Sequence, residues 1–203
     1  MSHRIPQLIL ITDSARMERE PFFATVEAAL EGGVDTVLVR EKAMDSARLL
    51  AFASRLRELT CQAGARLIVH TQADVAKAVQ ADGVHVGAID IAELPVMRQW
   101  LAGDAFALSA SCHHAEELQE AYDAGADFAL LSPVFPTRSH PGAVHLGVER
   151  FKELAAAAPL PIVALGGITL ENRSEISAYG VAVIRAILDA ENARQAAAKL
   201  RSH

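Results

Sequence analysis

The chain is poor in several features that define whole classes of protein. Its 203 residues include only two cysteines, Cys61 and Cys112, and its net charge is −6 at pH 7. Two cysteines cannot supply a disulfide framework or the spaced thiolates of a zinc site, and they are typical of a reducing cytoplasm. A negative net charge argues against a nucleic-acid-binding surface, although it does not exclude a small basic pocket that binds an anion.

Long apolar runs are also lacking. The N-terminal stretch MSHRIPQLILITD holds an apolar segment that is too short for a signal peptide or a membrane span, and no other stretch reaches spanning length. We therefore expect a cytoplasmic protein without a membrane partner. The 51% of hydrophobic residues is enough for a sizeable core, and no low-complexity linker divides the chain. One domain over residues 1–203 is expected, and the sequence leaves open whether copies form a homo-oligomer.

What the chain does contain is a regular succession of short apolar runs. Their apolar residues are continuous rather than alternating, as in parallel strands that are covered on both faces, and segments with helical spacing separate them. The runs are LILIT, TVLVR, RLIVH, GVHVG, FALSAS, FALLSPV, PIVALGG and VAVIRAI. Eight strands alternating with helices predict an α/β protein with a single (β/α)8 TIM barrel. A doubly wound sheet with fewer strands is the alternative.

In such a barrel the active site lies at the carboxyl ends of the strands, and REK follows the second run. The guanidinium of Arg40 suits phosphate oxygens, and Lys42 adds a second positive charge. The alternative is a surface ion pair of Glu41 with one of these cations.

The loops after the seventh and eighth runs indicate a phosphate site. Gly166 and Gly167 end the segment ALGG, where glycine lets the backbone approach an anion closely. Ile184 and Arg185 follow in the next loop, and these two loops commonly bind phosphate in barrels.

The segment SPVFPTRSHPG follows the sixth run. It offers the hydroxyls of Thr137 and Ser139, and Arg138 and His140 can carry positive charge. We expect a lid that closes over a diphosphate, the alternative being an exposed polar loop.

Several further residues are predicted to lie near the barrel mouth. His70 ends the third run, and Asp90 could give Mg²⁺ one contact, although Mg²⁺ needs further ligands from substrate phosphate or protein. His85, inside a strand, is predicted to be a structural core residue. Cys112 is predicted to be buried rather than nucleophilic, because no base is clearly placed for it. One histidine of the pair after Cys112 is expected to cap or pack near the start of the next helix.

The order of the motifs LILITD, VREK, ADGVHVG, SASCH, GADFALLSPVFPTRSHPG, LPIVALGGIT and GVAVIRAI resembles the thiamine phosphate synthase superfamily, which also holds thiazole tautomerases. The resemblance runs from about Leu8 to Leu188. It implies a (β/α)8 barrel and a reaction that joins hydroxymethylpyrimidine diphosphate to a thiazole phosphate, with Mg²⁺ assisting the release of diphosphate.

The resemblance also implies roles for individual residues. Arg40 and Lys42 stand at the positions of diphosphate-binding cations, Asp90 at a Mg²⁺-ligand position, and Ser111 at the serine near diphosphate and pyrimidine. The expected catalytic set is thus Arg40, Lys42, Ser111 and His140. The expected substrate- and phosphate-binding set is His70, Thr137, Ser139, Gly166, Gly167, Ile184 and Arg185.

The chain departs from the family pattern at several of these places. Leu38 stands where glutamine is usual, and residues 70–72 read His-Thr-Gln where the family usually has Asn-Asp-Arg. His140 replaces a lysine, and Arg185 replaces a serine. These changes predict an altered pyrimidine site and a weakened metal site. The histidine expected of a tautomerase aligns with Pro133.

The phrases SASCH, ADFALLSPV, SHPGA and AVIRAI are most similar to a divergent synthase-like branch that is often fused to a Nudix hydrolase domain, of which this chain would be a free-standing relative. Three hypotheses remain. The chain is a synthase with an altered site, a related enzyme in which His70 or His140 acts as acid or base, or a non-catalytic protein that binds thiazole or thiamine phosphates.

Overall fold

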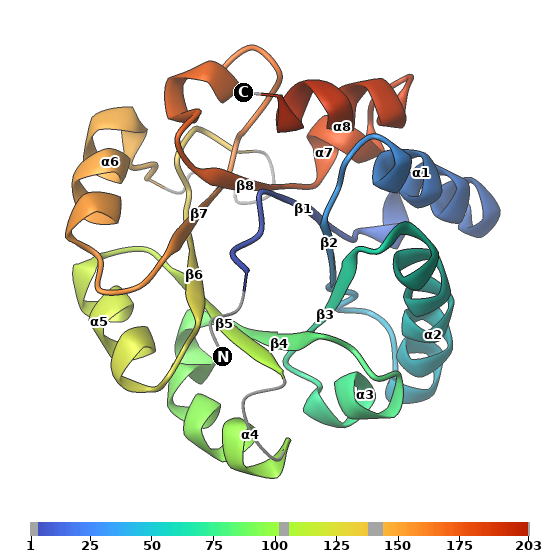
Figure 1. The fold of residues 1–203 in the computed structure, drawn as a ribbon, viewed down its shortest axis with the longest axis horizontal. Helices are drawn as coiled ribbons and strands as arrows, with labels where there is room; N and C mark the ends of the chain where they lie inside the picture. Colours follow the sequence, from blue (N-terminus) through green and yellow to red (C-terminus); the bar gives the residue numbers. More distant parts are fainter. Residues whose placement is uncertain (1–3, 102–105, 138–143, 203) are drawn as a thin grey trace.

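The computed structural model describes residues 4–101, 106–137 and 144–202. In this part of the chain, parallel strands form one closed barrel in chain order, and helices surround it (Figure 1). The strands are β1 (Leu8–Ile11), β2 (Thr36–Val39), β3 (Arg66–His70), β4 (Gly83–Val86), β5 (Ala107–Cys112), β6 (Phe128–Leu131), β7 (Ile162–Leu165) and β8 (Gly180–Val183). The (β/α)8 prediction is confirmed, and the doubly wound alternative is wrong because β1 pairs with β8 and closes the sheet.

The helices occupy the segments between the strands and form the outer ring of Figure 1. They are α1 (Arg19–Glu31), α2 (Ser46–Ala63), α3 (Ala73–Ala78), α4 (Leu94–Trp100), α5 (Ala115–Asp123), α6 (Gly147–Ala157), α7 (Arg185–Leu188) and α8 (Ala193–Arg201). Short 3-10 turns lie at Ser14–Arg16, Ala88–Glu93 and Arg173–Ile176. No helix of the described residues is long and apolar enough to cross a membrane.

One sequence expectation needs correction. The run VAVIRAI was predicted to be one strand, but β8 ends at Val183 and the chain then turns into the short helix α7. Ile187 and Leu188 in α7 are buried against the outer core, which explains why their apolar character continues past the end of the strand.

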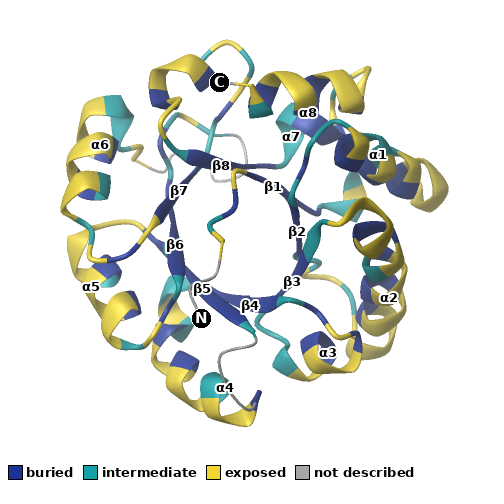
Figure 2. Cartoon of the chain, in the orientation of Figure 1, coloured by how far each residue is buried: buried dark blue, intermediate teal, exposed yellow. Residues whose placement is uncertain are grey.

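The strands are buried on both faces, as Figure 2 shows. Inside the barrel, one cluster contains Ile9, Leu38, Ile68, Phe128 and Val163. A larger cluster lies between the outer face of the strands and the helices. This two-sided burial explains the continuous apolar runs, because both alternating sets of strand side chains leave water.

The same type of ion pair recurs at the amino end of three strands of the barrel. An aspartate directly before β2, β4 and β6 binds an arginine from α8, α2 and α4 respectively. The same aspartates, Asp35, Asp82 and Asp127, accept backbone N–H bonds from Gln7, Leu67 and Leu108. Ile5 also packs against the interior cluster at this end. The amino end is therefore built for stability, and the functional groups are expected at the other end.

Candidate active site at the carboxyl end of the barrel

Strands β3, β4 and β5 bring four polar side chains together between the barrel interior and the mouth. The sheet register pairs His70 with His85 and His85 with Ser109. Ser111 lies two residues beyond Ser109 and therefore on the same face of β5. Nδ1 of His85 lies 2.9 Å from Oγ of Ser109, and Nε2 lies 2.9 Å from Oγ of Ser111. These contacts form a continuous polar chain from the barrel interior to the mouth.

Two cations, Arg40 and Lys42, follow β2. The backbone N–H of Arg40 donates to Oγ1 of Thr12 over 2.9 Å, which ties this loop to the end of β1. Glu41 does not pair with its neighbours, since its carboxylate accepts bonds from the backbone N–H and the hydroxyl of Ser14. Within the described residues, neither Arg40 nor Lys42 forms an ion pair. Both charges are therefore available for an anionic ligand.

His70 lies at the centre of this group. Burial lowers the pKa of His70, the positive charge of Arg40 lowers it further, and Lys42 adds a smaller effect in the same direction, while the His85 backbone carbonyl and Asp90 oppose them. Its Nδ1 is buried and makes no hydrogen bond within the described structure. A buried polar atom without a partner is costly, so a ligand atom is a natural partner for this nitrogen.

Asp90, in the 3-10 turn after β4, is the carboxylate that the sequence assigns to Mg²⁺. Among the described residues, no group of three or more histidine, cysteine, aspartate or glutamate side chains could hold a metal ion. Mg²⁺ commonly keeps several waters and binds through one or two carboxylates together with substrate phosphates. A single carboxylate such as Asp90 could hold Mg²⁺ only together with water and an anionic ligand, and its assignment to the metal stays a prediction.

Thr71 follows His70 in an unusual backbone conformation. Its φ angle is 58°, in the left-handed region that β-branched residues rarely adopt. Its N–H donates to the carbonyl of His85 over 2.8 Å, so the loop is anchored in this shape. The position at which the family usually has aspartate is thus occupied by a residue that is poorly suited to the local backbone.

The glycines after β7 pack against the loop after β6. A Cβ atom on Gly166 would lie 2.7 Å from Cα of Pro133, and one on Gly167 would lie 2.7 Å from the carbonyl oxygen of Phe135. The backbone of Phe135 donates to the carbonyl of Gly166 over 3.0 Å. The close approach that these glycines permit is therefore to another loop of the site. Their contact with phosphate stays a prediction.

The remaining candidates lie at the ends of β6 and β8. Thr137 is half-buried in the loop after β6, and Ile184 and Arg185 are half-buried at the start of α7. Arg138, Ser139 and His140 lie outside the described residues, so the expected lid and the role of His140 stay predictions.

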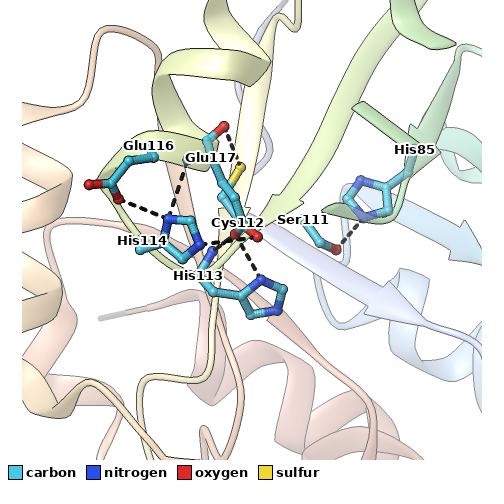
Figure 3. Close-up of polar contacts among 7 residues, drawn as sticks. All are labelled: His85, Ser111, Cys112, His113, His114, Glu116 and Glu117. Atoms are coloured by element: carbon cyan, nitrogen blue, oxygen red, sulfur yellow. Dashed lines mark hydrogen bonds and ion pairs between the residues drawn. The ribbon is translucent and has the colours of Figure 1, made fainter. Parts of the chain in front are cut away.

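His113 and His114, which follow Cys112, form hydrogen bonds with the first turn of α5 (Figure 3). His114 is the N-cap of α5 and accepts from the backbone N–H of Glu117, as expected for one of the two histidines. Glu117 in turn accepts from the backbone of His113 over 2.6 Å and contacts its ring over 2.9 Å. Cys112 is fully buried, and burial raises the pKa of its thiol to about 12. The prediction that Cys112 is buried is confirmed, and the raised pKa disfavours the thiolate form at neutral pH.

Two features of the mouth were not assigned to it from the sequence. His85 is buried, as predicted for a core residue, but it also contacts a candidate site residue, Ser111. The signal for this contact was the pattern SAS in β5, where two serines share the face that meets β4. The left-handed conformation of Thr71 has no sequence signal, because threonine is a poor residue for it.

Comparisons with known proteins identify the family of the chain. The family described as Thiamine monophosphate synthase matches residues 8–187. A thiamine-phosphate synthase of Chloroflexus aurantiacus is 36% identical over 201 residues, covering 97% of this chain and 91% of the relative. One from Methanococcus maripaludis is 36% identical and covers 90% of this chain and 87% of the relative.

The solved structure of a thiamine phosphate pyrophosphorylase from Pyrococcus furiosus superposes with a TM-score of 0.85 at 34% identity, covering 97% of this chain and 94% of that one. A 3-hexulose-6-phosphate synthase shares only the fold, with a TM-score of 0.69 at 17% identity. The match of the family over nearly the whole chain, together with these relatives, shows that the chain belongs to the thiamine monophosphate synthase family.

Proposed function

We propose that this chain is a thiamine-phosphate synthase whose metal and pyrimidine sites are altered. In the reaction the C–O bond between the pyrimidine methylene and the diphosphate breaks, and the diphosphate leaves with the bonding electrons. The thiazole nitrogen donates its lone pair to the methylene carbon and forms the new C–N bond. The products are thiamine phosphate and diphosphate. The names of the relatives support this reaction.

The observation that carries the proposal is that Arg40 and Lys42, after β2, have no ion-pair partner in the part of the chain that the structure describes. Arg40 and Lys42 would bind the diphosphate of the pyrimidine substrate and stabilise the charge that develops as it leaves. The hydrogen bond from the backbone N–H of Arg40 to Thr12 holds the backbone of this loop in place before substrate arrives. Ser111, half-buried at the end of β5, would donate its hydroxyl proton to the same anion.

The thiazole phosphate would lie on the opposite side of the mouth, against the loops after β6, β7 and β8. Thr137, Gly167 and Arg185 belong to these loops, and Arg185 would add a charge-assisted hydrogen bond. Ser139, Gly166 and Ile184 complete this proposed set, whereas His140 belongs to the proposed catalytic set with Arg40, Lys42 and Ser111.

The altered pyrimidine site follows from Leu38 and His70. Leu38 is buried in the interior cluster, so it offers the pyrimidine an apolar contact where the family usually offers an amide. The unpartnered Nδ1 of His70 would bond a pyrimidine ring atom or its amino group. When bound, Mg²⁺ would neutralise negative charge on the diphosphate, and Asp90 would hold it without a second carboxylate at position 71.

The test uses the full chain with hydroxymethylpyrimidine diphosphate, thiazole phosphate and Mg²⁺, and measures thiamine phosphate and diphosphate. We expect both products in equal amounts. Arg40→Met should lower kcat/KM by ~100-fold or more, since a removed charge-assisted contact to the leaving group acts mainly in the transition state. Arg150→Met is the matched control, because Arg150 pairs with Glu153 on the exposed face of α6 and should leave the rate unchanged.

The alternatives give different outcomes. A folded chain that is stabilised by thiazole phosphate or pyrophosphate but gives no product would be a binding protein. A chain that isomerises the thiazole phosphate without the pyrimidine substrate, and loses this activity in His70→Ala, would be a related enzyme. Either result would contradict synthase activity.

A further inference from the structure

His85 occupies a position where both of its ring nitrogens are committed. It is 2% exposed, inside the barrel on β4. Nδ1 contacts Ser109, which is 1% exposed, and Nε2 contacts Ser111 at the mouth. Figure 3 shows the imidazole directed at the Ser111 hydroxyl, on the side away from His113 and His114. The ring of His85 therefore connects the buried hydroxyl of Ser109 to the half-buried hydroxyl of Ser111 at the mouth.

The ring is neutral at physiological pH. Burial lowers the pKa of His85 to about 3, and the neighbouring His70 and Arg40 act in the same direction. A neutral imidazole has one N–H donor and one acceptor nitrogen. One of the two serines must therefore donate to the ring while the other accepts from it.

The two arrangements differ in what Ser111 can offer a ligand. If Nδ1 carries the proton, Ser111 must donate its own proton to Nε2 and turns only lone pairs towards the mouth. If Nε2 carries the proton, it donates to Ser111, and the Ser111 proton is free to bond a ligand oxygen. An anion accepts hydrogen bonds, so a site that contains Arg40 and Lys42 for anion binding favours the second arrangement.

We propose that His85 is a positioning residue: Ser109 donates to Nδ1 and holds the ring as the Nε2–H tautomer, and Nε2–H in turn directs the Ser111 hydroxyl proton at the diphosphate. This inference rests on the proposed function for the identity of the anion. The relay from Ser109 through His85 to Ser111 is already formed in the absence of substrate, so no side chain has to reorganise as the diphosphate leaves.

The tautomer is measured directly by NMR of the full chain labelled with ¹⁵N-histidine, free and with inorganic pyrophosphate. We expect the His85 proton on Nε2 in the pyrophosphate complex. A proton on Nδ1 in that complex would overturn the proposal. Because this measurement needs no turnover, it decides the role of His85 even if the chain lacks synthase activity, so failure of the relay and failure of the proposed function are distinguishable.

Two amide variants separate positioning from packing. In His85→Gln the terminal NH₂ can take the place of Nε2–H and donate to Ser111, whereas in the shorter His85→Asn the amide reaches only the place of Nδ1. We expect His85→Gln to keep kcat within about threefold of wild type, and His85→Asn to lower it by ~10-fold or more. KM for thiazole phosphate should change little in either variant. Equal rates in two variants of similar melting temperature would contradict the proposal.

Ser109→Ala tests the buried end of the relay, the contact between Ser109 and Nδ1 of His85. It also provides a test if His85→Asn does not fold. Ser109 is buried, so its hydroxyl does not contact the substrate directly, and its side-chain partner is His85. Without its donor, Nδ1 is free to carry the proton, and we expect the tautomer to shift and kcat to fall by several-fold. An unchanged tautomer with an unchanged kcat would show that Ser109 and His85 only fill space.

Discussion

The backbone N–H of Phe135 donates to the carbonyl of Gly166 over 3.0 Å, so the loop after β6 is bound to the glycine pair after β7. The N–H of Val134 makes the same kind of bond to Leu165 over 2.9 Å. The two loops proposed to bind the thiazole phosphate are therefore one unit. A substitution that displaces the loop after β7 should therefore also displace the loop after β6.

Gly167→Ala tests this coupling. Gly167 has φ 66°, and a Cβ there would lie 2.7 Å from the carbonyl oxygen of Phe135, which is backbone and cannot swing aside. We expect a loss of stability by about 3 kcal/mol or more, of which roughly 1–2 kcal/mol is the cost of the left-handed conformation itself. KM for thiazole phosphate should rise more than KM for the pyrimidine diphosphate.

Gly64→Ala is the matched control for Gly167→Ala. Gly64 has nearly the same φ, 64°, at the end of α2, but a Cβ there would have nothing within 4 Å. Denaturant unfolding should therefore show only the conformational cost of roughly 1–2 kcal/mol. Equal losses in the two variants would refute the claim that the β6 loop depends on Gly167.

The loop after β3 gives a second prediction. Thr71 has φ 58°, and asparagine and aspartate tolerate the left-handed region better than a β-branched residue. Thr71→Asn should therefore stabilise the chain by about 1 kcal/mol. Thr71→Asp should give a similar stabilisation at high ionic strength and should also supply the second carboxylate beside Asp90.

The metal dependence separates these two variants. We expect Thr71→Asp to lower the Mg²⁺ concentration that gives half-maximal activity by ~10-fold, since a second carboxylate strengthens an oxygen site. Thr71→Asn should leave it unchanged. A Thr71→Asp variant with the wild-type Mg²⁺ requirement would argue against a metal at Asp90.

The two cysteines should differ strongly in reactivity. Cys61 is exposed near the end of α2, whereas Cys112 is fully buried, with the pKa of its thiol raised to about 12 by burial and by Glu117 and Glu120. A thiol reagent at pH 8 should modify one cysteine in the native chain and both after unfolding, because the thiolate is the reactive species. Cys112→Ala should keep its catalytic rate, and a large loss of kcat without a loss of folding would assign a role to Cys112.

The barrel could be predicted from the sequence because the same pattern, an apolar run followed by a helical segment, recurs along the chain. Continuous apolar runs such as TVLVR and RLIVH, with helical spacing between them, fit few other architectures, and the structure confirms them as β2 and β3. The end of the last strand could not be placed, because Ile187 and Leu188 are apolar whether they belong to a strand or to α7.

The site was predictable only in part, for a physical reason. Residues at strand ends, such as Arg40 and Ser111, can be assigned to the mouth once the strands are counted. The relay through His85 depends on the register between β4 and β5, which pairs His85 with Ser109 and is set by the whole barrel rather than by local sequence. Likewise, the contact of Gly166 with Pro133 joins residues that are far apart in the chain.

The buried histidines give the last prediction, which concerns stability at acid pH. Burial lowers the pKa of His85 to about 3 and also lowers that of His70, so in the folded chain both stay neutral at a pH where they are protonated after unfolding. Arg40 opposes a charge on either ring, whereas Asp90 favours one on His70. Because the unfolded chain binds more protons, stability is complete above about pH 6.5 and falls as the pH drops towards the folded pKa values.

Each such histidine should contribute up to about 1.4 kcal/mol of destabilisation per pH unit in that range. Denaturant unfolding of wild type and His85→Gln between pH 7 and pH 4 measures the contribution, since glutamine has no proton to gain. We expect the curve of His85→Gln to be flatter than that of wild type. His145→Gln, which changes an exposed histidine, should keep the wild-type slope. If His85→Gln and wild type lose stability in parallel, His85 takes up its proton at the same pH in the folded and the unfolded chain, which would contradict a pKa lowered by burial.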